Sequence, residues 1–104
     1  MKVAYIAGPY RAKTIRGMVE NIRRAEKVAI KYWKKGYAVI CPHSNTALFD
    51  GSSPDEVWLN GDLELIKRSD TVVMIKGWEK SIGASNEYSY AKKLKKKIIF
   101  NELA

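Results

Sequence analysis

The sequence is poor in the residues that build cross-linked or membrane-embedded architectures. It has one cysteine, three prolines and one histidine among 104 residues. A single cysteine excludes a disulfide framework within the chain, and no apolar run approaches the roughly 18 residues that cross a bilayer. The opening segment, 1–7, carries no cleavable leader pattern. We therefore expect a cytoplasmic protein without a membrane partner.

Acidic residues are also scarce relative to basic ones. The chain has 19 lysine and arginine residues against 11 aspartate and glutamate residues, which gives a formal net charge of +8. This excess suits nucleic acid, an anionic lipid surface or a phosphorylated small molecule as partner. Most of the basic residues fall on the polar faces of predicted helices, and neither a zinc pattern nor an aromatic-interleaved RNA motif is present. We therefore rank nucleic acid below a small anionic ligand.

What the chain does contain is a regular alternation of apolar runs and amphipathic segments, within one domain that we predict to span 1–104. The continuous apolar runs are typical of strands buried on both faces, and the other segments show helical spacing. The predicted strands are 3–7, 37–41, 71–75 and 97–100, and the predicted helices are 15–35, 54–68 and 83–95.

Capping residues indicate where the helices begin. Thr14 is a suitable N-cap for the first helix. Ser53 and Glu56 form an S-x-x-E capping box, with Pro54 at the first helical position. The segment before it, 43–53, is predicted to be a polar loop that covers a ligand.

This βαβαβαβ pattern predicts an α/β fold in which helices cover both faces of a parallel sheet. We expect a flavodoxin-like, or Rossmann-like, three-layer sandwich of about four strands in the order 2-1-3-4. Strands one and three are then neighbours, and open α/β sheets bind ligands in the crevice outside the carboxyl ends of such strands. Two glycine-containing turns, 7–10 and 77–81, would flank that crevice.

Two carboxylates fall on helix faces that should be buried. Glu87 shares a face with Ala84 and Ala91, and Asp62 lies between Trp58 and Ile66. Each has an ordinary explanation: Glu87 stands in a first helical turn, where the dipole stabilises acids, and Asp62 would need only a buried arginine partner. Together they favour a polar site within the core, because an inward carboxylate must be paired, neutralised or used.

The turn that precedes Glu87 is rich in glycine, serine and lysine. A strand that passes into a helix through such a turn leaves free backbone N–H groups at the helix start, and these groups favour an anion. Ser81 is therefore either an anion ligand or a plain N-cap.

These motifs resemble the nucleoside 2-deoxyribosyltransferase superfamily. The likeness is carried by 77–84 with Glu87, by Asp62 and by the opening 5–10, and it extends over nearly the whole chain. It is strongest to the small members, the 2′-deoxynucleoside 5′-monophosphate N-hydrolases and related short proteins. The resemblance implies cleavage or transfer of the N-glycosidic bond of a (deoxy)nucleoside or its 5′-monophosphate, without cofactor or metal, by a homodimer or higher homo-oligomer.

The resemblance also implies roles for individual residues. Glu87 matches the nucleophile, which attacks C1′ of the sugar and forms a glycosyl-enzyme intermediate. Asp62 matches the aspartate that handles sugar and proton, and Tyr5 the tyrosine that positions the nucleophile. Ser81 and Gly83 match positions that hold a 5′-phosphate. The other expected substrate contacts are Gly8, Pro9 and Tyr10 in the first turn, His43 after the second strand, and Trp78, which is either a pocket wall or a packing residue.

Some features depart from the family pattern. The transferases carry C-terminal acidic residues that reach a neighbour's site, and here Asn101 or Glu102 are the candidates for that part. The Gly8-Pro9 opening also differs from the characterised hydrolases. Two other functions stay open: a nucleotide-binding or sensing module that lacks the reaction, and a basic nucleic-acid-binding domain, which would show a steep salt dependence.

Overall fold

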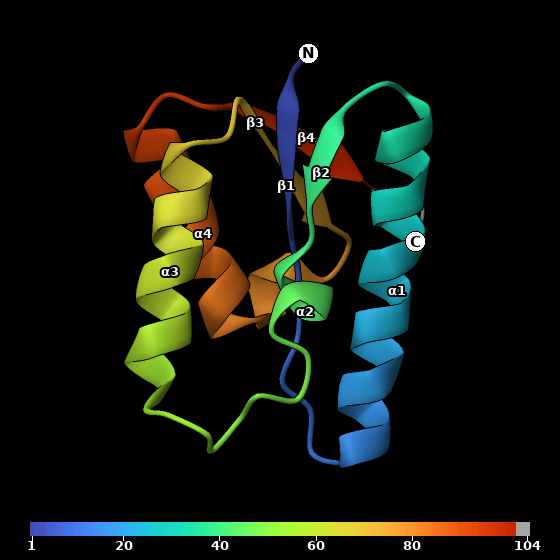
Figure 1. Ribbon diagram of the computed structural model, residues 1–104, viewed down its shortest axis with the longest axis vertical. Coiled ribbons are helices and arrows are strands. Elements are labelled where there is room, and N and C mark those ends of the chain that lie inside the picture. The colour runs from blue at the N-terminus through green and yellow to red at the C-terminus, as the bar shows by residue number, and fades with distance from the viewer. Residues whose placement is uncertain (102–104) are drawn as a thin grey trace.

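The structure, a computed structural model, describes residues 1–101 and has a parallel sheet at its centre (Figure 1). The strands are β1 Val3–Ala7, β2 Ala38–Ile40, β3 Thr71–Ile75 and β4 Lys97–Asn101. Over the described residues they form one four-stranded sheet in the order β2-β1-β3-β4, and every neighbouring pair is parallel. The predicted α/β class and the predicted strand order are confirmed.

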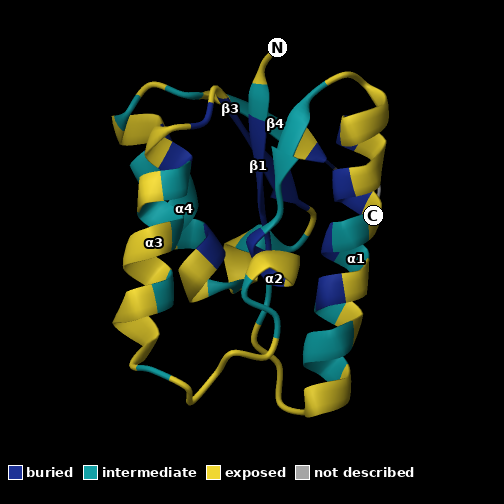
Figure 2. Cartoon of the chain, viewed as in Figure 1, coloured by how far each residue is buried: buried dark blue, intermediate teal, exposed yellow. Residues whose placement is uncertain are grey.

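Helices cover both faces of this sheet. They are α1 Ile15–Lys34, α2 Pro42–Asn45, α3 Asp55–Lys67 and α4 Ile82–Lys93, with a short 3₁₀ turn, η1 Trp78–Lys80, before α4. Figure 1 shows α1 on one side of the strands and α3 with α4 on the other. Figure 2 shows the inner strands as the most buried part of the chain, as expected for a sheet covered on both faces.

Alternation along β1 divides its side chains between the two layers. Ala4 and Ile6 pack against α1, whereas Tyr5 and Ala7 pack against α3 and α4. Tyr5 pairs with Ile40 on one side and with β3 on the other, which places it in the middle of the sheet. The phenol of Tyr5 therefore points into the layer that also holds the two carboxylates singled out above.

Helix starts agree with the sequence in one case and differ in another. Thr14 caps α1, because its hydroxyl accepts from Gly17 N at 3.0 Å. The capping box predicted at Ser53 is wrong: Pro54 is the N-cap of α3, its ψ is 146°, and no side chain caps the helix. Because Pro54 is extended, the helix begins one residue later than the box requires.

The segment 43–53 is not a loop throughout. Its first residues belong to α2, a single turn that starts at Pro42, and this turn buries His43. In α1, Tyr32 is buried, whereas Ile15 and Trp33 near the two ends of the helix are exposed. Within residues 1–101 no helix combines the length and the apolar character that a bilayer crossing requires.

Candidate active site

A hydrogen bond between strand and helix lies at the centre of the candidate site. The hydroxyl of Tyr5, which is fully buried, donates to the carboxylate of Glu87. Tyr5 comes from β1 and Glu87 from the second turn of α4, so the contact joins residues 82 positions apart. The sequence singled out both residues, and the structure brings them together.

A cavity of about 630 Å³ opens beside this pair at the carboxyl ends of β1 and β3. Glu87 and Asp62 both line it, the first from α4 and the second from α3. The remaining predicted residues in its wall are Gly8, Pro9, Tyr10, His43, Ser81 and Gly83. Residues up to 79 positions apart in the sequence, Gly8 and Glu87, thus meet at the switch point of the sheet, where such folds bind ligands.

Burial shifts the titration of both carboxyl groups. Desolvation raises the pKa of Glu87 to about 8; the hydrogen bond from Tyr5 opposes this rise, and the nearby charge of Asp62 adds to it. Desolvation also raises the pKa of Asp62 to about 6. The phenol of Tyr5 has its pKa raised well above the usual value by burial and then by the adjacent Glu87. Tyr5 therefore stays a neutral hydrogen-bond donor.

The start of α4 presents backbone donors to the cavity. Ser81 is the N-cap, since its hydroxyl accepts from Ala84 N at 3.1 Å. Gly83 lies in the first turn, and a Cβ built on it would meet nothing within 4 Å. The wall is therefore open at the helix terminus, where unpaired N–H groups and the dipole favour an anion.

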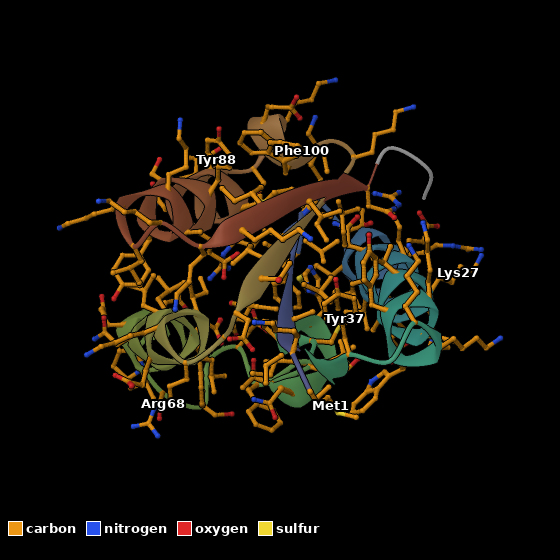
Figure 3. The ribbon with its side chains drawn as sticks, turned by 90° about the horizontal axis from the view of Figure 1, so that it is seen from above. Met1, Lys27, Tyr37, Arg68, Tyr88 and Phe100 are labelled. Carbon is orange, nitrogen blue, oxygen red and sulfur yellow. The ribbon has the colours of Figure 1, made fainter. Side chains whose placement is uncertain are left out.

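Trp78, a predicted substrate contact, lies outside the cavity wall. Its ring packs on Tyr88 with centroids 4.5 Å apart and on Phe100 at 6.1 Å. Figure 3, in which Tyr88 and Phe100 are labelled, shows these two side chains together at the β4 side of α4. Trp78 is not among the residues that line the cavity, and neither is Tyr5, which reaches the site only through Glu87.

The amino-acid sequence matches one family model over almost its whole length. Residues 1–100 match the model of a family described as a domain of unknown function, DUF4406. The chain belongs to the DUF4406 family. No protein of curated function matches its sequence.

Solved structures share the fold of this DUF4406 protein. A 2-deoxyribosyltransferase from the psychrotolerant bacterium Bacillus psychrosaccharolyticus has a TM-score of 0.67 at 21% identity, covering 98% of this chain and 76% of that one. A 2-deoxyribosyltransferase from Leishmania mexicana has a TM-score of 0.67 at 21% identity, covering 96% and 63%. The CMP N-glycosidase of Clostridium botulinum has a TM-score of 0.64 at 24% identity, covering 95% and 70%.

These likenesses confirm, at the level of the fold, the predicted resemblance to the nucleoside 2-deoxyribosyltransferases. The DUF4406 chain spans 63% to 76% of the length of these three proteins. Their activities bear on this chain only as the basis of a proposal.

The DUF4406 site also contains polar residues that the sequence did not single out. The Tyr10 hydroxyl donates to Asp50 Oδ1 at 2.6 Å, and Arg11 Nη2 donates to Asp55 Oδ2 at 2.6 Å. These bonds tie the turn after β1 to Asp50, which precedes α3, and to Asp55, the first residue of α3. They join residues 40 and 44 positions apart, and no periodicity marks the partners. The cavity wall also contains Arg24, Thr46, Trp58, Leu59, Lys80 and Ile82.

The C-terminal candidates lie away from this cavity or beyond the described residues. The side chain of Asn101 accepts from Lys31 Nζ at 3.0 Å, on the α1 side of the sheet. Asn101 is absent from the cavity wall. Glu102 lies outside the described residues.

Proposed function

We propose that this protein cleaves or transfers the N-glycosidic bond of a nucleoside or nucleotide, with Glu87 as the nucleophile. The observation that carries the proposal is the hydrogen bond from Tyr5 to Glu87 in a cavity that Asp62 also lines. The two deoxyribosyltransferases and the CMP N-glycosidase that share the fold support the same reaction class.

The chemistry needs a carboxylate below C1′. Breaking the bond to the base gives the sugar the character of an oxocarbenium ion, and a fixed negative charge stabilises it. The Glu87 carboxylate attacks C1′ and forms a glycosyl ester, while the base leaves with the bonding electron pair and takes a proton from Asp62. Water, or a second base, then attacks C1′; Asp62 accepts its proton, and Glu87 is released as a carboxylate.

The reaction requires one proton on the pair of carboxyl groups. Their pKa values are about 6 and about 8, so the pair holds one proton over most of the range between those values, mainly on Glu87. The reactive form is the less populated one, with that proton on Asp62 and a charge on Glu87. We expect kcat/KM to follow a bell-shaped pH profile with limbs near these two values, because the pair gains a second proton below it and loses its last above it.

A 5′-monophosphate suits the part of the cavity wall at the start of α4. Ser81, Gly83 and the first backbone N–H groups of α4 form an anion-favouring terminus in the cavity wall. Lys80, also in the wall, adds a positive charge. The excess of basic residues over the whole chain would attract such a ligand.

The test is release of free base. The protein is incubated with a panel of nucleosides and nucleoside 5′-monophosphates, and the products are separated by chromatography. Glu87→Gln should abolish release, by at least about a thousandfold, while circular dichroism shows an unchanged fold. Equal turnover by wild type and Glu87→Gln would refute the role of Glu87.

One observation favours a second function, a nucleotide-binding module without turnover. With a pKa of about 8, Glu87 is largely protonated at neutral pH in the empty cavity, and a protonated carboxyl is no nucleophile. Calorimetric binding of a nucleotide, with no free base after prolonged incubation at any pH between 6 and 9, would establish this second function instead.

A further inference from the structure

His43 is the most buried polar residue in the cavity wall and has an unusual hydrogen-bond arrangement. It is 5% exposed, and its Nε2 lies 3.2 Å from Gly8 O and 3.0 Å from Pro9 O. Both partners are carbonyl oxygens, which only accept, so the proton must be on Nε2. Its Nδ1 is buried and has no hydrogen-bond partner among residues 1–101. The ring is therefore a neutral imidazole whose single N–H is shared by two backbone carbonyls.

These two carbonyls belong to the turn that forms one wall of the cavity. On its other side the turn presses against β3, because a Cβ on Gly8 would come within 2.8 Å of Ile75. The turn is thus confined between Ile75 and the imidazole of His43. Its backbone has room to move only if one of these two contacts is lost.

The same turn places Tyr10. The rings of Tyr10 and His43 form an edge contact, with centroids 6.1 Å apart and planes at 69°. The Tyr10 hydroxyl accepts from Leu48 N at 3.2 Å and donates to Asp50, which lines the cavity. Displacing the turn would therefore also release the segment before α3 that Tyr10 holds.

We infer that His43 is a positioning residue, which holds the Gly8–Pro9 turn and Tyr10 in place through its Nε2–H and neither donates a proton to the substrate nor binds it through Nδ1. The inference rests on the function proposed above, since the turn matters only if the cavity takes a ligand. It differs from the role implied by the family resemblance, which is contact with the base or sugar. Burial lowers the pKa of His43 below its usual value, which agrees with a ring that stays neutral.

Two amide variants separate the possible roles. The side-chain nitrogen of glutamine reaches as far as Nε2, and its NH₂ group offers two donors for the two carbonyls. The side-chain nitrogen of asparagine reaches only as far as Nδ1, and neither amide titrates. We expect His43→Gln to retain kcat/KM within about threefold and His43→Asn to lose about tenfold to a hundredfold, because small displacements of a substrate-binding wall are costly. Both variants should keep the shape of the wild-type pH profile.

Other outcomes overturn the inference. Equal large losses in both variants, with one limb of the pH profile missing, would identify His43 as a proton donor or a direct ligand. Full activity in both would show that the clamp, by which we mean the hydrogen bonds from Nε2–H to the carbonyls of Gly8 and Pro9, has no functional role. Melting temperatures measured in parallel distinguish a local loss from global destabilisation: a loss in both variants that follows melting temperature alone would reduce His43 to a structural residue.

A readout independent of turnover separates this inference from the proposed function. Long-range ¹⁵N–¹H NMR of the wild type at pH 7 should show the neutral Nε2–H tautomer of His43. An Nδ1–H tautomer or an imidazolium would overturn the clamp even in an active enzyme. Absence of base release together with the Nε2–H tautomer would count against the proposed reaction, and nucleotide affinities of the two variants would then test the clamp, with His43→Asn expected to bind at least about tenfold more weakly.

Discussion

The two faces of the sheet are built from the same strands but are used differently. On one face, α1 contributes five buried residues to an apolar layer, Ile22, Ala25, Val28, Ala29 and Tyr32. On the other face, α3 and α4 together contribute three, Ile66, Ala84 and Ala91. The difference corresponds to the cavity, which opens between α3, α4 and the turns at the carboxyl ends of β1 and β3.

The apolar layer under α1 offsets the cost of the carboxylates that are buried on the other face. Burying Glu87 and Asp62 costs free energy, as their raised pKa values record. The buried cluster under α1 is formed by hydrophobic side chains and contributes burial energy without that cost. Ala4 and Ile6 pack in this layer, whereas Tyr5 between them donates a hydrogen bond to Glu87 in the site. The same strand, β1, therefore contributes to both faces.

The functional difference between the two faces is tested most directly by changing one residue on each face. Asp62→Asn removes the proposed proton donor from the α3 face, and we expect kcat to fall about a hundredfold with one limb of the pH profile lost. Val28→Ala, in the α1 layer, should cost about 1 to 2 kcal/mol in the free energy of unfolding and leave kcat unchanged. Steady-state kinetics and urea unfolding measure the pair. Comparable losses of kcat in both variants would mean that the faces are not functionally distinct.

Much of this division was visible in the sequence. The runs 3–7 and 72–75 are apolar at every position, which is typical of strands covered on both sides, and both lie in strands of the structure. Glu87 and Asp62 stood out because helical periodicity placed them inward. Their meeting at one cavity follows from the strand order, which puts the carboxyl ends of β1 and β3 side by side.

What escaped the sequence lies in irregular segments and short turns. His43 is one residue in a four-residue helix, too short for any periodicity to show that it is buried. The bond from Arg11 to Asp55 depends on how the connection after β1 packs against the start of α3 in three dimensions. Trp78 looked like a pocket wall from its place in the turn, but the neighbouring aromatic rings of Tyr88 and Phe100 hold it outside the cavity.

A second comparison uses the two buried tyrosines. Tyr5→Phe removes the hydroxyl that donates to Glu87, which should lower kcat/KM about tenfold and raise the pKa of Glu87 further, because that hydrogen bond lowers it. Tyr32→Phe is the matched control in the α1 layer, where Tyr32 is 3% exposed. It should leave the pH profile unchanged. The upper limb of the kcat/KM profile measures the shift, and an identical limb in all three proteins would show that Tyr5 does not tune Glu87.

The cost of the buried carboxylate should appear in the pH dependence of stability. Glu87 titrates near 8 in the folded protein and near 4.5 when unfolded, so the folded state binds the proton more tightly, and stability falls as pH rises between those values. Glu87→Gln cannot ionise. We expect it to match the wild type near pH 4.5 and to exceed it by about 2 to 4 kcal/mol at pH 9. Thermal unfolding of both proteins across this range measures the gap, and a gap independent of pH would contradict the raised pKa.

The smallest effect is expected at the start of α4, where the cavity wall lacks a side chain. Gly83→Ala places a methyl group in open space, so the fold should tolerate it and helix propensity should even improve. If a 5′-phosphate sits on this terminus, the methyl group narrows its approach, and KM for a nucleoside monophosphate should rise about threefold to tenfold. KM for the matching nucleoside, which has no phosphate, should stay the same. An equal rise for both substrates would show that the phosphate does not bind at Gly83. The orientation of the substrate would then have to be determined from the part of the wall where Tyr10 and Arg11 bind the carboxylates of Asp50 and Asp55.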